Sequence, residues 1–402
     1  MALASGTPGL AILDDVFPSE YSAFRFAEFS AYLNEFSGAR VYSDGTALRF
    51  VGEKRSLDEL LRAYRQRHRR LGDRVVALRQ DAQLSGDFAY TIFVSNMSRF
   101  LHALERRSIP FAFTLYPGGG LGLGRPECDA KLRRIFGSPQ FRAVIVTQRN
   151  VRDYLVNWGF CPPEKIEFIY GVVTSGGQNP VYADEKPCFG RNKDTFDVCF
   201  AAHKYTRDGI DKCFDVFVEM GRLLARLSDA FRFHVVGGFK PEDVADDIRH
   251  RTIFHGVQSQ HSFGALFRKM DLILSPTPAY GWQAGVFDGF PTGSCVEAGL
   301  HGVPVFSTDP HNLNILFEDG KDIVLVSREP KAIAETIERY FRAPELLIDL
   351  SRATAPSFRR AFGYDAQIGK RIDFIRSLVD ANAANAPLST RGHQHWGAHP
   401  LG

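Results

Sequence analysis

The sequence predicts an α/β protein built from two doubly wound parallel sheets, one in each half of the chain. At 402 residues the chain is longer than one hydrophobic core usually supports. Its hydrophobic fraction of 44% and charged fraction of 24% are those of an ordinary globular protein. Short β-branched apolar runs alternate with longer amphipathic stretches, which is typical of repeated β-α units. Two such domains would leave a cleft at the carboxyl ends of both sheets, where ligands of these folds bind.

The N-terminal half opens with an apolar run at residues 10–16, which predicts the first strand. An amphipathic helix is expected over residues 21–36, with phenylalanines along one face. Further apolar runs predict the remaining strands of this half, at residues 90–94, 111–115, 143–147 and 165–170. A helix over residues 149–158 is expected before the last of these strands. Together these elements predict an N-terminal domain over residues 1–175.

The C-terminal half follows residues 176–195, which are dense in Gly, Pro and charge and are interpreted as a linker. Apolar runs then predict strands at residues 197–201, 231–236, 252–254, 272–275 and 303–307. Amphipathic stretches predict helices over residues 211–227, 263–269, 294–301 and 331–341. We therefore expect a second domain over residues 196–360 and a terminal helix over residues 361–380. The aperiodic end, residues 381–402, predicts a disordered tail.

Composition and charge narrow the classes of function. The net charge of +3 does not indicate nucleic-acid binding. The six cysteines form no C-x-x-C pair, which favours reduced thiols, a cytoplasmic setting and no structural zinc. The N-terminus lacks the pattern of a signal peptide, and no stretch approaches the ~20 apolar residues of a membrane span. We expect a cytoplasmic protein, associated with membranes at most peripherally.

One local charge run stands out, on a predicted helix within residues 62–74. Its members are Arg62, Arg65, Arg67, His68, Arg69, Arg70 and Arg74. The pattern favours a solvated helix face, and the alternative is a weak contact with an anionic membrane or a lipid phosphate.

The most informative stretch, residues 287–306, predicts a loop, a short helix and a buried strand. The loop and the helix start consist of turn-forming and small residues: Asp288, Gly289, Phe290, Pro291, Thr292, Gly293 and Ser294. A helix that begins there directs unpaired N–H groups and its positive dipole end at the cleft, which suits a diphosphate. Glu297 lies one turn further on, so its carboxylate could accept two hydrogen bonds from a ribose diol.

Residues 297–305, EAGLHGVPV, resemble the E-A-x-x-x-G-x-P-V core of the large retaining glycosyltransferase family known as glycosyl transferases group 1. The resemblance implies the GT-B fold, in which two Rossmann-like domains face a cleft. In that family two glutamates are spaced E-x7-E; the second holds the ribose and the first lies close to the donor sugar. Glu297 matches the second, whereas Gly289 occupies the position of the first. Either a one-residue bulge presents Asp288 instead, or the sugar-side carboxylate is absent.

A second match concerns the diphosphate. Lys212 opens KCFDVFVE, which resembles the family's K-G-x-D-x-L helix start. In the family this lysine and an arginine about five residues earlier neutralise the diphosphate. Arg207 has that spacing, but His203 and Lys204 lie nearer the strand end, so the cation that takes the arginine's role stays open.

Weaker matches occur in the family's order over residues 144–310. Gly256 and Val257 fall in a segment that resembles the family's F-x-G-x loop, whose backbone usually meets the nucleobase. Residues 165–172, 235–238 and 271–276 resemble further segments of the family pattern.

Candidate acceptor residues follow strand ends of the N-terminal half and rest on topology alone. They are Ser22, Asn96, Tyr116, Gly118 and Gly119. The glycines of residues 114–122 could admit a sugar or a phosphate to the backbone, or could form a mobile loop with no ligand.

The resemblance implies transfer of a sugar, with retention, from a nucleoside-diphosphate sugar to a glycan, a lipid-linked or another acceptor. Asp288 and Glu297 are then the candidate catalytic residues, and no metal is required because cationic side chains and a helix end can take the diphosphate's charge. The alternatives are a sugar-nucleotide epimerase of the same fold and a non-catalytic protein that binds nucleotide-sugars.

Overall fold

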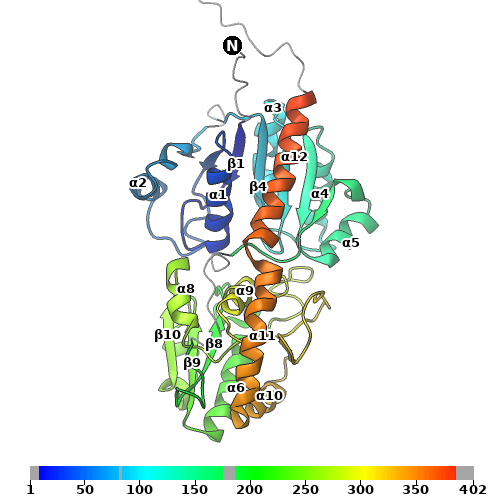
Figure 1. The fold of residues 1–402 in the computed structure, drawn as a ribbon. Helices are drawn as coiled ribbons and strands as arrows, with labels where there is room; N and C mark the ends of the chain where they lie inside the picture. Colours follow the sequence, from blue (N-terminus) through cyan, green and yellow to red (C-terminus); the bar gives the residue numbers. More distant parts are fainter. Residues whose placement is uncertain (1–8, 81–83, 175–185, 386–402) are drawn as a thin grey trace, which may run out of the picture.

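The computed structural model describes residues 9–80, 84–174 and 186–385. Two parallel sheets lie one above the other along the molecule, each flanked by helices (Figure 1). The strand order is β3-β2-β1-β4-β5-β6-β7 in the first sheet and β10-β9-β8-β11-β12-β13 in the second. The predicted α/β fold with two doubly wound parallel sheets is confirmed.

The first sheet belongs to the N-terminal half. Its strands are β1 (Leu10–Asp14), β2 (Arg40–Ser43), β3 (Val75–Ala77), β4 (Phe88–Ile92), β5 (Phe111–Leu115), β6 (Phe141–Val146) and β7 (Ile166–Phe168). Its helices are α1 (Ala23–Glu35), α2 (Leu57–Arg67), α3 (Val94–Arg106), α4 (Pro126–Phe136) and α5 (Arg149–Asn157). The sequence analysis missed β2 and β3, because strands of four and three residues are too short to show a period.

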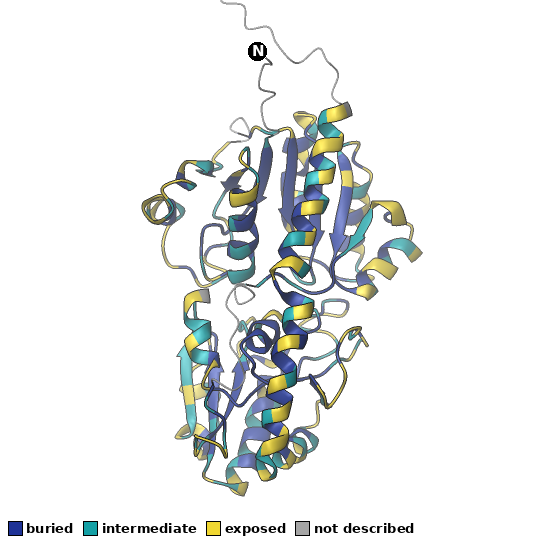
Figure 2. Cartoon of the chain, viewed as in Figure 1, coloured by how far each residue is buried: buried dark blue, intermediate teal, exposed yellow. Residues whose placement is uncertain are grey.

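The second sheet belongs to the C-terminal half. Its strands are β8 (Phe196–Ala201), β9 (Phe231–Val236), β10 (Thr252–Gly256), β11 (Leu272–Ser275), β12 (Val305–Ser307) and β13 (Val324–Leu325). Its helices are α6 (Phe214–Leu227), α7 (Asp246–Arg249), α8 (Gln260–Phe267), α9 (Gly293–Leu300), α10 (Pro330–Arg342) and α11 (Pro344–Phe362). The central strands β8, β9 and β11 are largely buried on both faces, whereas the edge strand β10 is partly exposed, and most of the helices turn one side to solvent (Figure 2).

The end of the chain returns to the N-terminal half. After α11, a π-helical turn (Asp365–Gly369) redirects the backbone, and α12 (Lys370–Asn385) runs along the first sheet (Figure 1). Ile372, Ile375 and Val379 of α12 are buried in the same cluster as Phe29 and Tyr90. The disordered tail was predicted to begin at residue 381, but α12 continues through Asn385, so the predicted boundary is too early. Residues 386–402 lie outside the described part of the chain.

A buried polar network holds α12 in place. Glu28 accepts hydrogen bonds from the hydroxyls of Tyr32 and Tyr116, each at 2.9 Å, and from Tyr90. Arg371 of α12 lies with its Nε 4.0 Å from Glu28 Oε1, and both residues are fully buried. Because a buried charge is costly without its partner, this pair ties the last helix to the first sheet.

The expected linker is only partly a linker. Residues 175–185 lie outside the described residues, but Lys186 is buried and donates to the carbonyl of Met270 at 2.6 Å. The segment after residue 185 thus packs on the second sheet. The division of the chain into domains at residues 175 and 196 stays a prediction.

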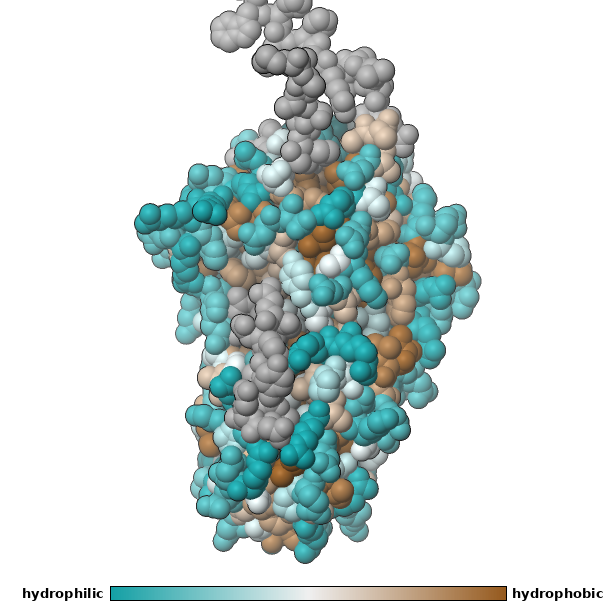
Figure 3. Space-filling model, in the orientation of Figure 1, coloured by the Kyte–Doolittle hydropathy of each residue, from teal (hydrophilic) through white to brown (hydrophobic). Residues whose placement is uncertain are grey.

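The basic run is not a single helix face. Helix α2 ends at Arg67, and Arg74 donates to the carbonyls of Phe36 and Ser37 beyond the end of α1, at 2.9 and 3.1 Å. The projecting region that carries α2 is hydrophilic (Figure 3). Across the described residues, every helix is too short or too polar to cross a bilayer.

Candidate functional site

A cavity of about 370 Å³ lies between the two halves, at the carboxyl ends of strands from both sheets. The C-terminal half contributes the loops after β8, β9, β10 and β11 and the start of α9. The N-terminal half contributes the start of α1, residues 50–51 after β2 and residues 172–174 after β7. This volume and position are typical of ligand sites in doubly wound folds.

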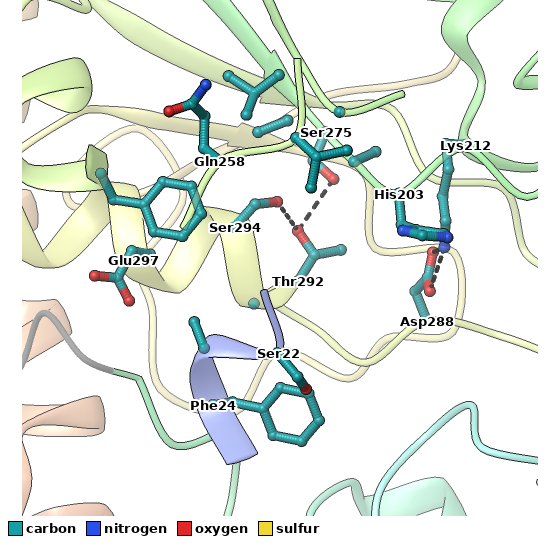
Figure 4. A pocket seen from close by; sticks show the side chains of 18 of the residues that line it. Ser22, Phe24, His203, Lys212, Gln258, Ser275, Asp288, Thr292, Ser294 and Glu297 are labelled. Carbon is teal, nitrogen blue, oxygen red and sulfur yellow. Dashed lines mark hydrogen bonds and ion pairs between the residues drawn. The ribbon is translucent and has the colours of Figure 1, made fainter. Parts of the chain in front are cut away.

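The floor of the cavity is the start of α9. Thr292 occupies the N-cap position with extended backbone, and its Oγ1 lies 3.3 Å from Ser294 Oγ and 3.4 Å from Ser275 Oγ (Figure 4). Helix α9 can lie here because Gly299, further along the helix, lets it pack closely on α11. A Cβ on Gly299 would lie 2.3 Å from Phe358 Cδ1. Hydroxyls, backbone N–H groups and the positive helix end therefore face the cavity together.

Glu297 lines the same cavity one turn after the helix start and is only 4% exposed. Its backbone carbonyl lies 2.8 Å from Nδ1 of His301, near the end of α9. Val257, Gln258 and Phe263 line the cavity as well, with Gln258 toward the same end as Glu297 (Figure 4). The predicted grouping of Glu297 with the helix start is thus present in the geometry.

Lys212 and Asp288 meet in the cavity. Lys212 Nζ lies 2.7 and 2.6 Å from the two carboxylate oxygens of Asp288 (Figure 4). Burial by itself lowers the pKa of Lys212, but Asp288 outweighs it and the pKa of the ammonium is raised above its usual value. The Asp288 carboxylate therefore lines the cavity, and its role as the sugar-side carboxylate of the motif stays a prediction.

The other predicted cations do not reach the cavity lining. Lys204 Nζ pairs with Asp243 at 2.6 Å and lies over the Phe239 ring, and Arg207 is exposed. His203 lines the cavity instead. Burial, together with the charge of Lys212, lowers the pKa of His203, so its imidazole is neutral at pH 7. Cys213, with its left-handed backbone (φ 53°), ends the turn that directs Lys212 inward.

Three further donor candidates lie beside the cavity rather than on its lining. Val257 lines it, but Gly256 does not. Gly289 and Phe290 lie at the contact between the halves, where Gln148 Nε2 donates to the Phe290 carbonyl at 3.3 Å. A Cβ on Gly289 would lie 3.0 Å from the same nitrogen. These two residues thus join the halves at the edge of the site.

Among the acceptor candidates, only Ser22 lines the cavity, at the N-cap of α1. Asn96 is buried and accepts from Arg99 at 2.6 Å, and Tyr116 is buried in the network around Glu28. Gly118 and Gly119 form a turn with positive φ, and a Cβ on Gly119 would lie 2.2 Å from the Phe93 ring. The other four candidates lie outside the cavity lining. Following a strand end places a residue somewhere along the edge of a sheet, and that edge is wider than the cavity.

The sequence analysis missed the aromatic wall of the cavity. Phe24, Phe50 and Tyr205 line it, and the rings of Phe50 and Tyr205 stack with centroids 5.4 Å apart. Phe50 comes from the N-terminal half and Tyr205 from the C-terminal half. No periodic signal marks either residue, because both lie on loops.

Over the described ranges, no three His, Cys, Asp or Glu side chains are grouped so that they could hold an ion.

Residues 198–343 match the family model described as glycosyl transferases group 1. The matched segment contains Lys212, Asp288 and Glu297. The chain is a nucleotide-sugar-dependent glycosyltransferase, and its C-terminal half is similar to this group. Among curated proteins, none matches the sequence of this glycosyltransferase significantly.

Solved structures share the fold of the glycosyltransferase over nearly its whole length. HepE from Anabaena, in complex with UDP, is 14% identical, with a TM-score of 0.64 over 92% of this chain and 100% of its own. Sucrose-phosphate synthase from Thermosynechococcus elongatus is 16% identical, with a TM-score of 0.59 over 93% and 100%. A glycosyltransferase from Rickettsia africae is 13% identical, with a TM-score of 0.57 over 94% and 100%. The GT-B fold expected from the sequence is thereby confirmed.

Proposed function

We propose that this glycosyltransferase moves a sugar from a nucleoside-diphosphate sugar to a hydroxyl of a glycan, a lipid-linked or another acceptor, with retention at the anomeric carbon. The observation that carries the proposal is the convergence of Lys212, the start of α9 and Glu297 on one cavity. HepE, which shares the fold, has been solved with UDP and with UDP-glucose. That likeness supports a uridine-type donor as the first to be tried.

The polar groups of the cavity suit the parts of such a donor in order. The diphosphate would lie at the start of α9, where Thr292 and Ser294 offer hydroxyls and the backbone offers N–H groups. The ribose hydroxyls would donate to Glu297, and the base would meet Val257 and Gln258. Each charge-assisted hydrogen bond of this kind contributes about 1.5–3 kcal/mol.

The ion pair between Lys212 and Asp288 has a place in this scheme. Without a ligand, each group neutralises the other at 2.6–2.7 Å. A diphosphate brings a stronger negative charge to Lys212, so the lysine would exchange Asp288 for phosphate oxygens. Asp288, released beside the cavity, would then accept hydrogen bonds from the donor sugar. In this role it replaces the sugar-side carboxylate of the family motif.

The proposed chemistry is a direct exchange at the anomeric carbon. The acceptor hydroxyl oxygen forms the new bond on the face from which the diphosphate departs, and the bond from that carbon to the phosphate oxygen breaks. The hydroxyl proton passes to the departing phosphate. Lys212 and the positive end of α9 stabilise the negative charge that develops on the leaving group, which is the main task of such a site.

The test begins with isothermal titration of UDP, GDP and their hexose conjugates against the full chain. We expect saturable binding of at least one nucleoside diphosphate. Transfer is then assayed with candidate glycosides, and the product's anomeric configuration is read by NMR. Failure to bind any nucleoside diphosphate would contradict the proposal, and inversion in the product would contradict retention. An epimerised donor formed without acceptor would favour the epimerase, and binding without turnover a non-catalytic protein.

A further inference from the structure

A row of exposed aromatic rings leads out of the cavity at its Lys212 end. The ring of Tyr205 stacks on Phe50 with centroids 5.4 Å apart, and meets Trp282 edge-on with centroids 5.2 Å apart. Phe50, Tyr205 and Trp282 come from three separate loops and are 61%, 41% and 50% exposed. Large apolar side chains gathered in the open are uncommon in soluble proteins and mark binding sites.

The row begins at the reacting end of the site. Lys212 Nζ lies 5.1 Å from the centre of the Tyr205 ring and contacts Asp288 on its other side. Phe50 and Tyr205 line the cavity, whereas Trp282 stands beyond its lining. The nucleobase end, at Gln258, lies across the start of α9 from Lys212 (Figure 4). The row is therefore placed beyond the sugar end of a bound donor.

Trp282 is held in position by its loop. Gly281 N–H donates to the Val286 carbonyl at 2.8 Å, which closes the loop on itself. Leu123 N–H of the N-terminal half donates to the Gly285 carbonyl at 2.9 Å. These bonds hold the backbone beside Trp282, and the edge-on contact with Tyr205 holds its ring. A ring carried on a fixed loop loses less freedom when a ligand stacks on it, which favours binding.

We propose that Trp282 and Tyr205 form an acceptor subsite that binds a sugar ring of the acceptor. The C–H faces of a pyranose are weakly positive and pack on the negative face of an aromatic ring. A sugar stacked on Trp282 directs a hydroxyl toward the anomeric carbon held between Lys212 and Asp288. The acceptor is thus a carbohydrate at the position next to the bond that forms. This inference rests on the proposed function.

The test compares Trp282→Ala and Trp282→Phe with Trp158→Ala. Trp158 is a matched control because it is 63% exposed and follows α5, away from the cavity lining. Each protein is probed on a printed array of neutral and acidic oligosaccharides in the presence of UDP, and UDP binding is titrated separately. Thermal unfolding shows that each variant is folded.

We expect Trp282→Ala to weaken binding of the recognised oligosaccharides by about tenfold or more, a change of about 1.4 kcal/mol. Trp282→Phe should recover part of the lost oligosaccharide binding, and Trp158→Ala should bind the oligosaccharides as the native chain does. All four proteins should bind UDP equally. The inference is overturned if the native chain binds UDP but no sugar, or if Trp282→Ala keeps the native array pattern. Loss of UDP binding by the native chain would instead count against the proposed function.

Discussion

The two sides of the cavity between the halves are built in different ways. The C-terminal side carries most of the polar groups, including Lys212 and four residues of one stretch, Asp288, Thr292, Ser294 and Glu297. The N-terminal side is largely apolar and comes from the segment that leads into α1, residues 21–24, and from two loops, at residues 50–51 and 172–174. Binding a diphosphate and a ribose requires a strand, a loop and a helix start in immediate succession. A wall of apolar side chains requires only that the fold bring them together.

The two sides of the cavity should therefore contribute differently to binding. Removing a polar group of the C-terminal side should weaken nucleotide binding strongly. Removing a ring of the N-terminal side should affect the contact between the halves and leave the nucleotide contacts largely intact.

The largest effect is expected for Glu297→Ala. We expect the affinity for UDP, or for whichever nucleoside diphosphate binds, to fall by roughly 2–4 kcal/mol, because one or two charged hydrogen bonds to the ribose are lost. Isothermal titration measures it. Glu335→Ala on the exposed face of α10 serves as the control. Native affinity in a folded Glu297→Ala protein would remove Glu297 from the donor site.

A somewhat smaller loss is expected for Lys212→Met, about 1.5–3 kcal/mol in the same titration, since a charge-assisted contact to the diphosphate disappears. The variant also leaves Asp288 without its 2.6 Å partner. The double variant Lys212→Met, Asp288→Asn separates the two causes. Asp288→Asn alone should bind the free nucleotide at least as well as the native chain but turn over the donor more slowly. Weakened nucleotide binding by this variant would argue against its sugar-side role.

On the N-terminal side, Phe50→Ala should change nucleotide affinity less than either variant above. Its ring stacks across the cavity on Tyr205, and aromatic pairs contribute about 0.5–1.5 kcal/mol beyond area burial. A double-mutant cycle with Tyr205→Ala, read by thermal unfolding, should give a coupling of that size. A coupling near zero would show that the stack does not hold the halves together.

A modest pH effect is expected through His203. Its pKa in the free protein is below the usual value because of burial and the nearby Lys212. A bound diphosphate favours the imidazolium and raises that pKa, so binding takes up a proton. UDP affinity should therefore rise modestly as the pH is lowered from 7.5 toward 5.5, because the imidazolium becomes available to the bound diphosphate. The His203→Gln variant should lose this pH dependence of UDP affinity. If the UDP affinity of the native chain does not change with pH in this way, His203 does not contact the diphosphate.

The smallest effect is expected for Lys204→Ala and Arg207→Ala. Lys204 is paired with Asp243, and Arg207 is exposed outside the cavity lining. Both variants should bind UDP within about twofold of the native chain, less than a surface ion pair usually contributes. A strong loss in Arg207→Ala would mean that its loop closes on the bound donor.

The sequence by itself determined the fold class and the helix start that lines the C-terminal side of the cavity. Alternating β and α patterns predicted both parallel sheets, and the segment around Thr292, Ser294 and Glu297 predicted the helix start that faces the cavity. These features are local, because a helix N-terminus and a carboxylate one turn away are set by neighbouring residues. Strands β2 and β3 were not predicted because they are too short to show a period.

Only the tertiary structure decided the rest. It placed Asp288 against Lys212, 76 positions away in sequence, and left Lys204 with Asp243. It returned α12 to the first sheet through Arg371 and Glu28, and it brought Phe50, Tyr205 and Trp282 into one row. Some of these pairings lie within the C-terminal half, and others join the two halves. No period, cap or spacing encodes them, because each contact joins residues far apart along the chain.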